Sequence, residues 1–154
     1  MKAFFFVLFG LWILDTGCSS AKKANKTMVQ QGITGRITKV TGNRMPMVGV
    51  TLPAPKGLLT MVYVYAPTAI SQVTPPATTS LYTAIATKAV DSVRTDSSGY
   101  FTISLAPGSY SVFIRQGNAF YANLFDAKNN IALFTVEPGK LTRVNLTVSS
   151  GAFY

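Results

Sequence analysis

The stretch TDSSGYFTISLAPGSYSV, residues 95–112, decides the fold of this chain. Phe101 and Ile103 alternate with polar residues, and after a short break Tyr110 and Val112 repeat the alternation. A period of two is typical of a β-strand with one face on a core and the other in solvent. The stretch therefore predicts two neighbouring strands whose apolar side chains form facing core layers.

The turns of this stretch carry signals of their own. Asp96 is expected to accept hydrogen bonds from backbone N–H groups before the first strand, where Gly99 takes a positive φ. Pro107-Gly108 is expected to close a tight hairpin. The ring of Tyr110 should then face inward, with its hydroxyl group within reach of the backbone. One carboxylate without others nearby is a poor metal site, so Asp96 is interpreted as a turn residue.

Alternation of the same kind continues on both sides, and from Gly32 onward no stretch has convincing helical periodicity. Gly and Pro punctuate the alternating segments, as they do in turns. The sequence therefore predicts an all-β fold, a small antiparallel Greek-key β-sandwich of about seven strands. The domain is expected to span residues 31–150, followed by a short tail at 151–154. Further strands are expected near residues 33–37, 59–65, 131–136 and 144–148.

Two segments interrupt this pattern. Residues 66–80 are dominated by Thr, Ala and Pro, and they predict a long, partly mobile loop inside an insertion at about residues 51–93. Residues 116–130 carry aromatic side chains between Asn-rich ends. This second segment is expected to be a long connection between strands.

Three aromatic residues of that connection, Phe120, Tyr121 and Phe125, leave two interpretations open. They either pack the connection onto the core, or they form an exposed patch that binds a glycan or a protein. Their place outside an alternating strand predicts that Phe120→Ala and Tyr121→Ala cost less stability than Phe101→Ala.

The N-terminus has the pattern of an export signal. Residues 4–14, FFFVLFGLWIL, follow a basic start and form an apolar run that is too short to cross a bilayer. Such a run is typical of the apolar region of a signal peptide. We therefore expect the protein to be exported.

Gly17-Cys18 comes directly after this signal, and Cys18 is the only Cys of the chain. The pair resembles a bacterial lipoprotein lipobox, although Asp15 stands where Leu is usual. The resemblance implies a lipoprotein signal peptide in residues 1–17, lipidation of Cys18, and a flexible basic tether in residues 18–30. Ordinary cleavage after Ala21 is the alternative.

The composition excludes several kinds of chemistry. The chain has 154 residues, of which 48% are apolar and 12% charged, with no His and one Cys. A core is therefore available, whereas His-based triads, zinc sites built on His or Cys, and internal disulfides are excluded. The acids beyond the signal lie in four separate regions, so neither a paired-carboxylate site nor any cofactor or metal is expected. They are Asp91, Asp96, Asp126 and Glu137.

The net charge of +9 comes from Lys and Arg residues that are scattered along the chain. The sequence has neither a clustered basic run nor a basic motif interleaved with aromatic residues, so we expect no nucleic-acid partner. A solvated basic surface is one interpretation, and weak attraction to anionic lipid or glycan is the other.

The motif of residues 95–112, T-D-x-x-G-x-F-x-I followed by P-G-x-Y-x-V, closely resembles the signature of carboxypeptidase regulatory-like domains. The opening Gly32-Ile33-Thr34-Gly35-Arg36-Ile37 looks like their first strand. The resemblance implies a transthyretin-like sandwich, and the whole pattern is similar to single-domain lipoproteins of Bacteroidetes. Relatives of that fold that hydrolyse 5-hydroxyisourate use His residues, so the absence of His excludes this activity.

From these observations we expect a lipid-anchored, non-catalytic module of the bacterial cell envelope, at the outer membrane. Its role would be structural or binding, with the membrane contacted through the lipid anchor and an envelope protein or glycan as partner. The alternatives are a secreted carbohydrate-binding accessory protein and, less favoured, a periplasmic enzyme with an unrecognised site.

Overall fold

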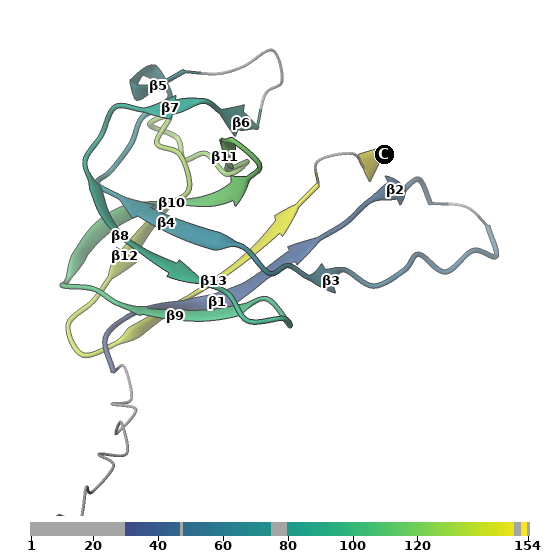
Figure 1. The fold of residues 1–154 in the computed structure, drawn as a ribbon, viewed down its shortest axis with the longest axis horizontal. Helices are drawn as coiled ribbons and strands as arrows, with labels where there is room; N and C mark the ends of the chain where they lie inside the picture. The colour runs from purple at the N-terminus through teal and green to yellow at the C-terminus, as the bar shows by residue number, and fades with distance from the viewer. Residues whose placement is uncertain (1–29, 47, 75–79, 150–151, 154) are drawn as a thin grey trace, which may run out of the picture.

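The computed structural model describes residues 30–46, 48–74, 80–149 and 152–153, which form an all-β sandwich (Figure 1). The predicted signal peptide, Cys18, nearly all of the tether and parts of the tail lie outside the described residues. Among the described residues seven strands have four residues or more, which agrees with the predicted number. They are β1 (Gly32–Lys39), β4 (Met61–Tyr65), β8 (Ala89–Arg94), β9 (Tyr100–Ser104), β10 (Gly108–Gln116), β12 (Leu133–Val136) and β13 (Leu141–Val148).

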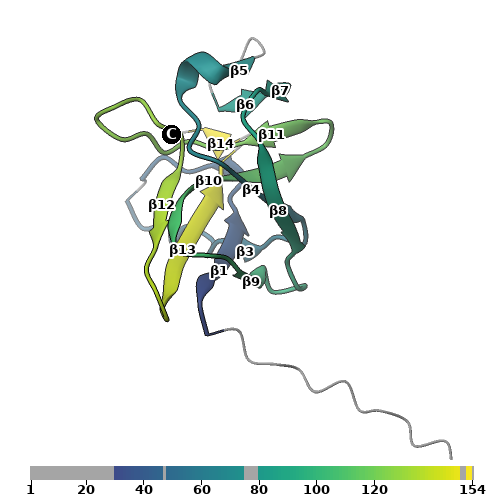
Figure 2. The ribbon, with the colours of Figure 1, turned by 90° about the vertical axis from the view of Figure 1, so that its left-hand side faces the viewer.

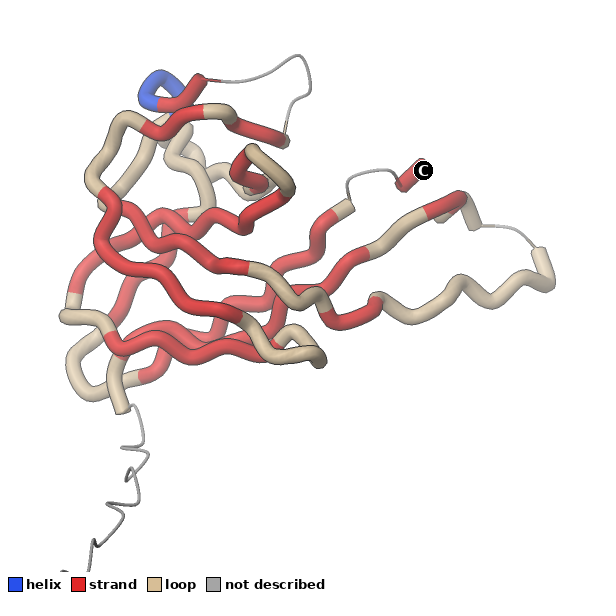
Figure 3. The backbone as a smooth tube through the Cα atoms, in the orientation of Figure 1, coloured by secondary structure: helices blue, strands red, loops and turns tan. Residues whose placement is uncertain are grey.

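Shorter elements lie between these strands, and Figure 3 shows them as brief coloured segments in long loops. The short strands are β2 (Gly42–Asn43), β3 (Lys56–Gly57), β5 (Val73–Thr74), β6 (Leu81–Tyr82), β7 (Ala84–Ile85), β11 (Ala119–Tyr121) and β14 (Ala152–Phe153). One 3-10 turn, η1, spans Ile70–Gln72. Within the described residues no helix is long and apolar enough to cross a membrane.

The first sheet is built around β1, which has β13 on one side and β9 on the other. β9 runs antiparallel to β1, and the end of β1 also pairs with β3. β1 and β13 run parallel, in register from Gly32 opposite Leu141 to Lys39 opposite Val148. The antiparallel arrangement expected from the sequence therefore does not extend to this pair.

The second sheet is built around β10, the longest strand. One edge of β10 pairs first with β12 and then with β11, and its other edge pairs with β4, beyond which lies β8. Figures 1 and 2 show this sheet lying across the first one. Two sheets packed face to face in this way make a sandwich.

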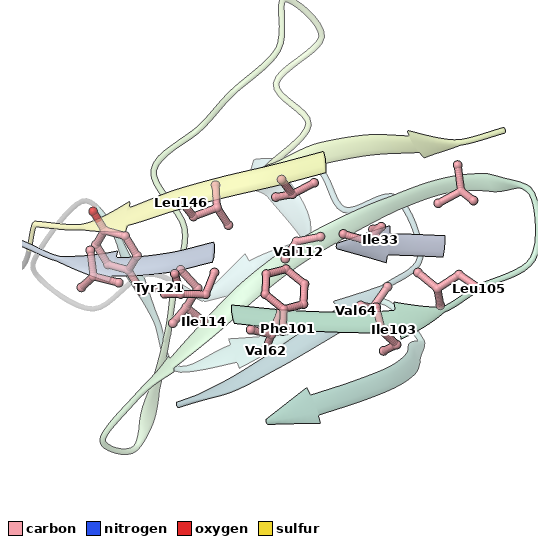
Figure 4. Close-up of a cluster of buried hydrophobic side chains, with 14 residues drawn as sticks. Ile33, Val62, Val64, Phe101, Ile103, Leu105, Val112, Ile114, Tyr121 and Leu146 are labelled. Atoms are coloured by element: carbon pink, nitrogen blue, oxygen red, sulfur yellow. The ribbon is translucent and has the colours of Figure 1, made fainter. Parts of the chain in front are cut away.

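The main core lies between the two sheets (Figure 4). Phe101 and Ile103 of β9 reach it from the first sheet, and Val112 and Ile114 of β10 reach it from the second. The facing layers predicted from residues 95–112 are therefore confirmed for Phe101, Ile103 and Val112, while Tyr110 is partly buried and packs against this core. Other members of this core are Ile33, Ile37, Val62, Val64, Leu105, Tyr121, Val136, Val144, Leu146 and Val148.

The Pro107-Gly108 turn does not close a hairpin, which corrects the prediction made from the sequence. β9 pairs with β1 in the first sheet, whereas β10 lies in the second sheet, so the turn carries the chain from one sheet to the other. Alternation is compatible with both arrangements because each strand needs only one apolar face. Tyr110 nevertheless reaches the backbone as expected, since its hydroxyl group donates to the Ala106 carbonyl oxygen at 3.0 Å.

The turn before β9 is formed as predicted. Asp96 Oδ1 accepts hydrogen bonds from the backbone N–H groups of Ser98 at 2.8 Å and Tyr100 at 2.9 Å. Gly99 has a φ of 86°, and a Cβ atom there would lie 2.0 Å from the Ile37 carbonyl oxygen. Asp96 is thus a structural residue of the turn, and Gly99 is required both by its φ and by the approach of β1.

A second, smaller core covers the outer face of the second sheet. Tyr65 and Phe113 point to this face, where they pack against Tyr82, Ala122, Ile131 and Ala132. The covering chain comes from residues 66–74 and 80–87 and from the connection after β11, which are drawn beyond β10 and β4 in Figure 1.

The described part of residues 66–80 is therefore more ordered than the predicted loop. Thr68 is fully buried, its N–H group donates to Ser111 Oγ at 3.0 Å, and its carbonyl oxygen accepts from the Ile131 N–H group at 2.8 Å. The composition of this segment predicts a loop because its apolar residues follow no periodic pattern. Hydrogen bonds of its backbone nevertheless hold the described part of the segment on the second sheet.

Tyr82 offers a test of this second core. Its hydroxyl oxygen is buried without a hydrogen-bond partner among the described residues. Because a buried, unpaired hydroxyl group is destabilising, Tyr82→Phe should raise the free energy of unfolding by about 1 kcal/mol. Tyr121→Phe is the matched control, since its hydroxyl group bonds Ser149 Oγ at 3.0 Å and its removal should cost about 1 kcal/mol. Urea denaturation measures both, and equal losses in the two variants would contradict this account.

Candidate functional site

The three aromatic residues predicted as a binding patch do not lie together. Tyr121 is 3% exposed and belongs to the main core, where its hydroxyl group bonds Ser149. Phe120 is its neighbour on β11 and points to the opposite face of the second sheet, since successive side chains of a strand alternate. For Tyr121 the exposed-patch interpretation is wrong, and the core interpretation holds.

Phe120 is half-buried against the second core. Its ring centroid lies 5.3 Å from that of Tyr63 and 6.0 Å from that of Tyr65, both in edge-to-face geometry. The Arg115 guanidinium carbon lies 5.0 Å from the same centroid. The Phe120 ring therefore packs against neighbouring side chains of the protein.

Phe125 alone of the three is well exposed, at 48%. It borders a small hollow of about 100 Å³ with Leu124 and Phe134. Beside it, Asp126 accepts hydrogen bonds from Asn130, whose side chain is the main cause that lowers the pKa of the Asp126 carboxyl group. This loop therefore has one exposed ring and a carboxylate engaged in its own turn, which does not make the predicted patch.

A more extended candidate site lies on the outer face of the first sheet. In β1, β9 and β13 one set of alternating residues enters the core and the other faces solvent. Apart from Leu141 at the start of β13, which is 39% exposed, the outward set is polar or aromatic, and we call its central part the polar sheet face. It consists of Thr34, Arg36 and Thr38 of β1, Tyr100 and Thr102 of β9, and Arg143, Asn145 and Thr147 of β13.

The strand registers place these side chains in rows across the sheet. Tyr100, Arg36 and Asn145 occupy one row, because Arg36 is opposite Tyr100 on one side and Asn145 on the other. Thr102, Thr34 and Arg143 occupy the next row. Two arginines that are more than a hundred positions apart in sequence thus become diagonal neighbours on one face.

A shallow groove crosses the polar sheet face. Its larger part has a volume of about 310 Å³ and the adjoining part about 130 Å³. Both parts are lined by Tyr100, Arg143 and Asn145. The Tyr100 side chain is 56% exposed, so its ring is available to a ligand.

Hydrogen bonds hold several of these groups in place. Arg36 Nε donates to the Ser98 carbonyl oxygen at 2.9 Å, and the guanidinium carbon lies 5.2 Å from the Tyr100 ring centroid. Asn145 Oδ1 accepts from the Arg36 backbone N–H group at 3.1 Å. The Asn145 amide is therefore oriented with its NH₂ group left for other partners.

The threonines of the polar sheet face bond in pairs. The hydroxyl oxygens of Thr34 and Thr102 are 2.8 Å apart, and those of Thr38 and Thr147 are 3.0 Å apart. Cross-strand pairs of this kind stabilise the sheet and keep its outer surface flat. In the described part of the chain no three His, Cys, Asp or Glu residues lie close enough together to hold a metal ion.

The sequence alone does not reveal this site, because its basic residues are scattered along the chain. One signal in the sequence could have indicated the site. Arg36 and Arg143 each alternate with core residues of a predicted strand, which places both on the solvent-facing side of their strands. No family model, curated protein or solved structure matches this chain.

Proposed function

We propose that this protein is a non-catalytic glycan-binding module of a bacterial cell envelope, with the polar sheet face as its binding surface. The observation that carries the proposal is the groove, in which the exposed Tyr100 ring lies beside Asn145 and two arginines. An aromatic ring can pack on the apolar face of a sugar, while amide and guanidinium groups bind its oxygens. The open, shallow shape suits an extended polymer.

The arrangement of the acids supports a non-catalytic role. Asp96 and Asp126 bind backbone N–H groups of their own turns, and Glu137 pairs with Lys140. Asp91 accepts from the N–H group of the next residue. Glycoside hydrolysis normally needs two carboxyl groups on either side of one bond, so these four acids support binding without cleavage.

The attachment to the envelope rests on the sequence. The apolar run at residues 4–14 followed by Gly17-Cys18 supports lipidation of Cys18 and a position at the outer membrane. The motif of residues 95–112 supports a relation to carboxypeptidase regulatory-like domains as part of the same proposal.

The test is affinity electrophoresis of the purified full-length protein in gels that contain single polysaccharides, neutral and acidic. Tyr100→Ala should reduce the retardation and raise the dissociation constant by at least about tenfold, because the ring is the main apolar contact of the groove. Val90→Ala is the control, since Val90 is an exposed residue of the second sheet. The proposal fails if no polysaccharide retards the protein, or if Tyr100→Ala binds like the wild type.

A second candidate function, docking to an envelope protein, is favoured by a separate observation. Residues 44–46 and 48–55, between β2 and β3, extend away from the sandwich (Figure 1) and expose Met45, Val48 and Val50, of which Val48 is fully exposed. Exposed apolar residues grouped on one projection are typical of a protein contact. Loss of a protein partner in Val48→Asp, with polysaccharide binding intact, would favour this function.

A further inference from the structure

We infer that the ligand of the polar sheet face is an acidic polysaccharide, whose uronic-acid carboxylates bind between Arg36 and Arg143. The inference rests on the proposed function and adds the chemical class of the glycan. It starts from the placement of two arginines on the same groove. Arg36 lies opposite Asn145, which is two residues from Arg143 on the same strand.

Neither guanidinium group forms an ion pair with a residue in the part of the chain that the structure describes. Among the described residues the one ion pair joins Lys140 to Glu137. Arg36 instead bonds the backbone of the turn that follows Asp96, through the Ser98 carbonyl oxygen. Both arginines line the same groove, so an anion bound in it is attracted by both charges.

The hydrogen-bonding groups left for a ligand are mostly donors. Asn145 Oδ1 already accepts from the backbone, and the threonine hydroxyl groups are directed at one another. The guanidinium N–H groups and the Asn145 NH₂ group only donate, whereas the hydroxyl oxygens of Tyr100 and the threonines can also accept. The charged groups of this face are donors only, and a ligand with anionic acceptors, such as a carboxylate, matches them best.

Arg36 is held in position before the ligand arrives. Its Nε atom donates to the Ser98 carbonyl oxygen, and its guanidinium carbon lies 5.2 Å from the centroid of the Tyr100 ring. This leaves its terminal NH₂ groups as a fixed fork, the geometry that matches two carboxylate oxygens. Because little side-chain freedom is lost on binding, the contact is strengthened by preorganisation. The neighbouring Tyr100 ring then lies where the sugar that bears the carboxylate would pack.

The experiment measures dissociation constants of the full-length protein for three polymers: polygalacturonate, dextran sulfate and neutral pullulan. Polygalacturonate should bind most tightly, and Arg143→Ala should weaken it by about tenfold or more. Arg36→Ala should have a similar or larger effect. Arg94→Ala is the matched control, because Arg94 is an exposed arginine on β8 of the other sheet and its loss removes the same charge. We expect it to change the constant by less than about twofold.

Each contrary outcome has its own meaning. If pullulan binds as tightly as polygalacturonate and Arg143→Ala has no effect, the acidic ligand is refuted while glycan binding stands. If none of the three polymers binds, nor any polysaccharide in the gel series, the proposed function fails as well. If dextran sulfate binds more tightly than polygalacturonate, the inference that carboxylates are the recognised groups is refuted. Equal losses in Arg94→Ala and Arg143→Ala refute a specific site, since they indicate attraction by net charge alone.

Discussion

Phe101→Ala should lower the free energy of unfolding by about 3–5 kcal/mol, the usual cost of removing a buried aromatic ring. Phe101 is 5% exposed and lies between the two sheets, in contact with the main core (Figure 4). Single domains have only about 5–15 kcal/mol of stability in total, so the variant should unfold at a much lower urea concentration. Circular dichroism during urea titration measures the shift.

Phe120 and Tyr121 are the comparison for this variant. The sequence predicts a smaller loss for both, and the structure reverses this expectation for Tyr121, which is a core residue. Tyr121→Ala should therefore cost about as much as Phe101→Ala, whereas Phe120→Ala should cost about 2 kcal/mol for its half-buried ring. The placement of the two cores would be contradicted if Phe120→Ala proved the most damaging of the three.

Gly35→Ala should be as damaging, for a different reason. A Cβ atom on Gly35 would lie 1.7 Å from the carbonyl oxygen of Val144, the residue opposite it on β13. The obstacle is backbone, so the two strands would have to separate and break hydrogen bonds of their ladder. We expect a loss of about 3 kcal/mol or more, measured by the same urea titration.

Gly117→Ala is the control for this variant. Gly117 has a φ of 55° and open space around its Cβ position, so the added methyl group meets no atom. Only the left-handed backbone conformation is unfavourable for Ala, at about 1–2 kcal/mol. If both variants lost the same amount, the close approach of β1 and β13 would not be the cause.

Local features of the fold could be predicted from the sequence because they depend on neighbouring residues. Asp96 and Gly99 form their turn through hydrogen bonds and a φ that involve a few consecutive positions. The apolar faces of β9 and β10 follow from alternation in the same way. Strand pairing does not, because alternation assigns a face to each strand and leaves its partner open. The parallel pairing of β1 with β13 joins segments from opposite ends of the domain, and nothing local specifies it.

The candidate site was missed for the same reason. Arg36 and Arg143 are isolated in the sequence, and they share a groove only because β1 and β13 pair in this register. The converse error concerns Phe120 and Tyr121, which are adjacent in sequence but point to opposite faces of a short strand. A strand of three residues is too short for its alternation to be recognised in the sequence. Two aromatic residues that are adjacent in sequence therefore suggest a shared patch that the strand does not form.

The parallel pairing of β1 with β13 also determines how the domain responds to a pulling force. In parallel strands the chain enters β1 and leaves β13 at opposite ends of the ladder, so tension between the two termini slides one strand along the other. All eight residue pairs between Gly32 and Lys39 then bear the load at once, and β9 adds resistance on the other side. An antiparallel pair of terminal strands would instead open one hydrogen bond at a time. Forced unfolding depends on the unfolding rate, and a ladder loaded in shear must lose these pairs together before it unfolds.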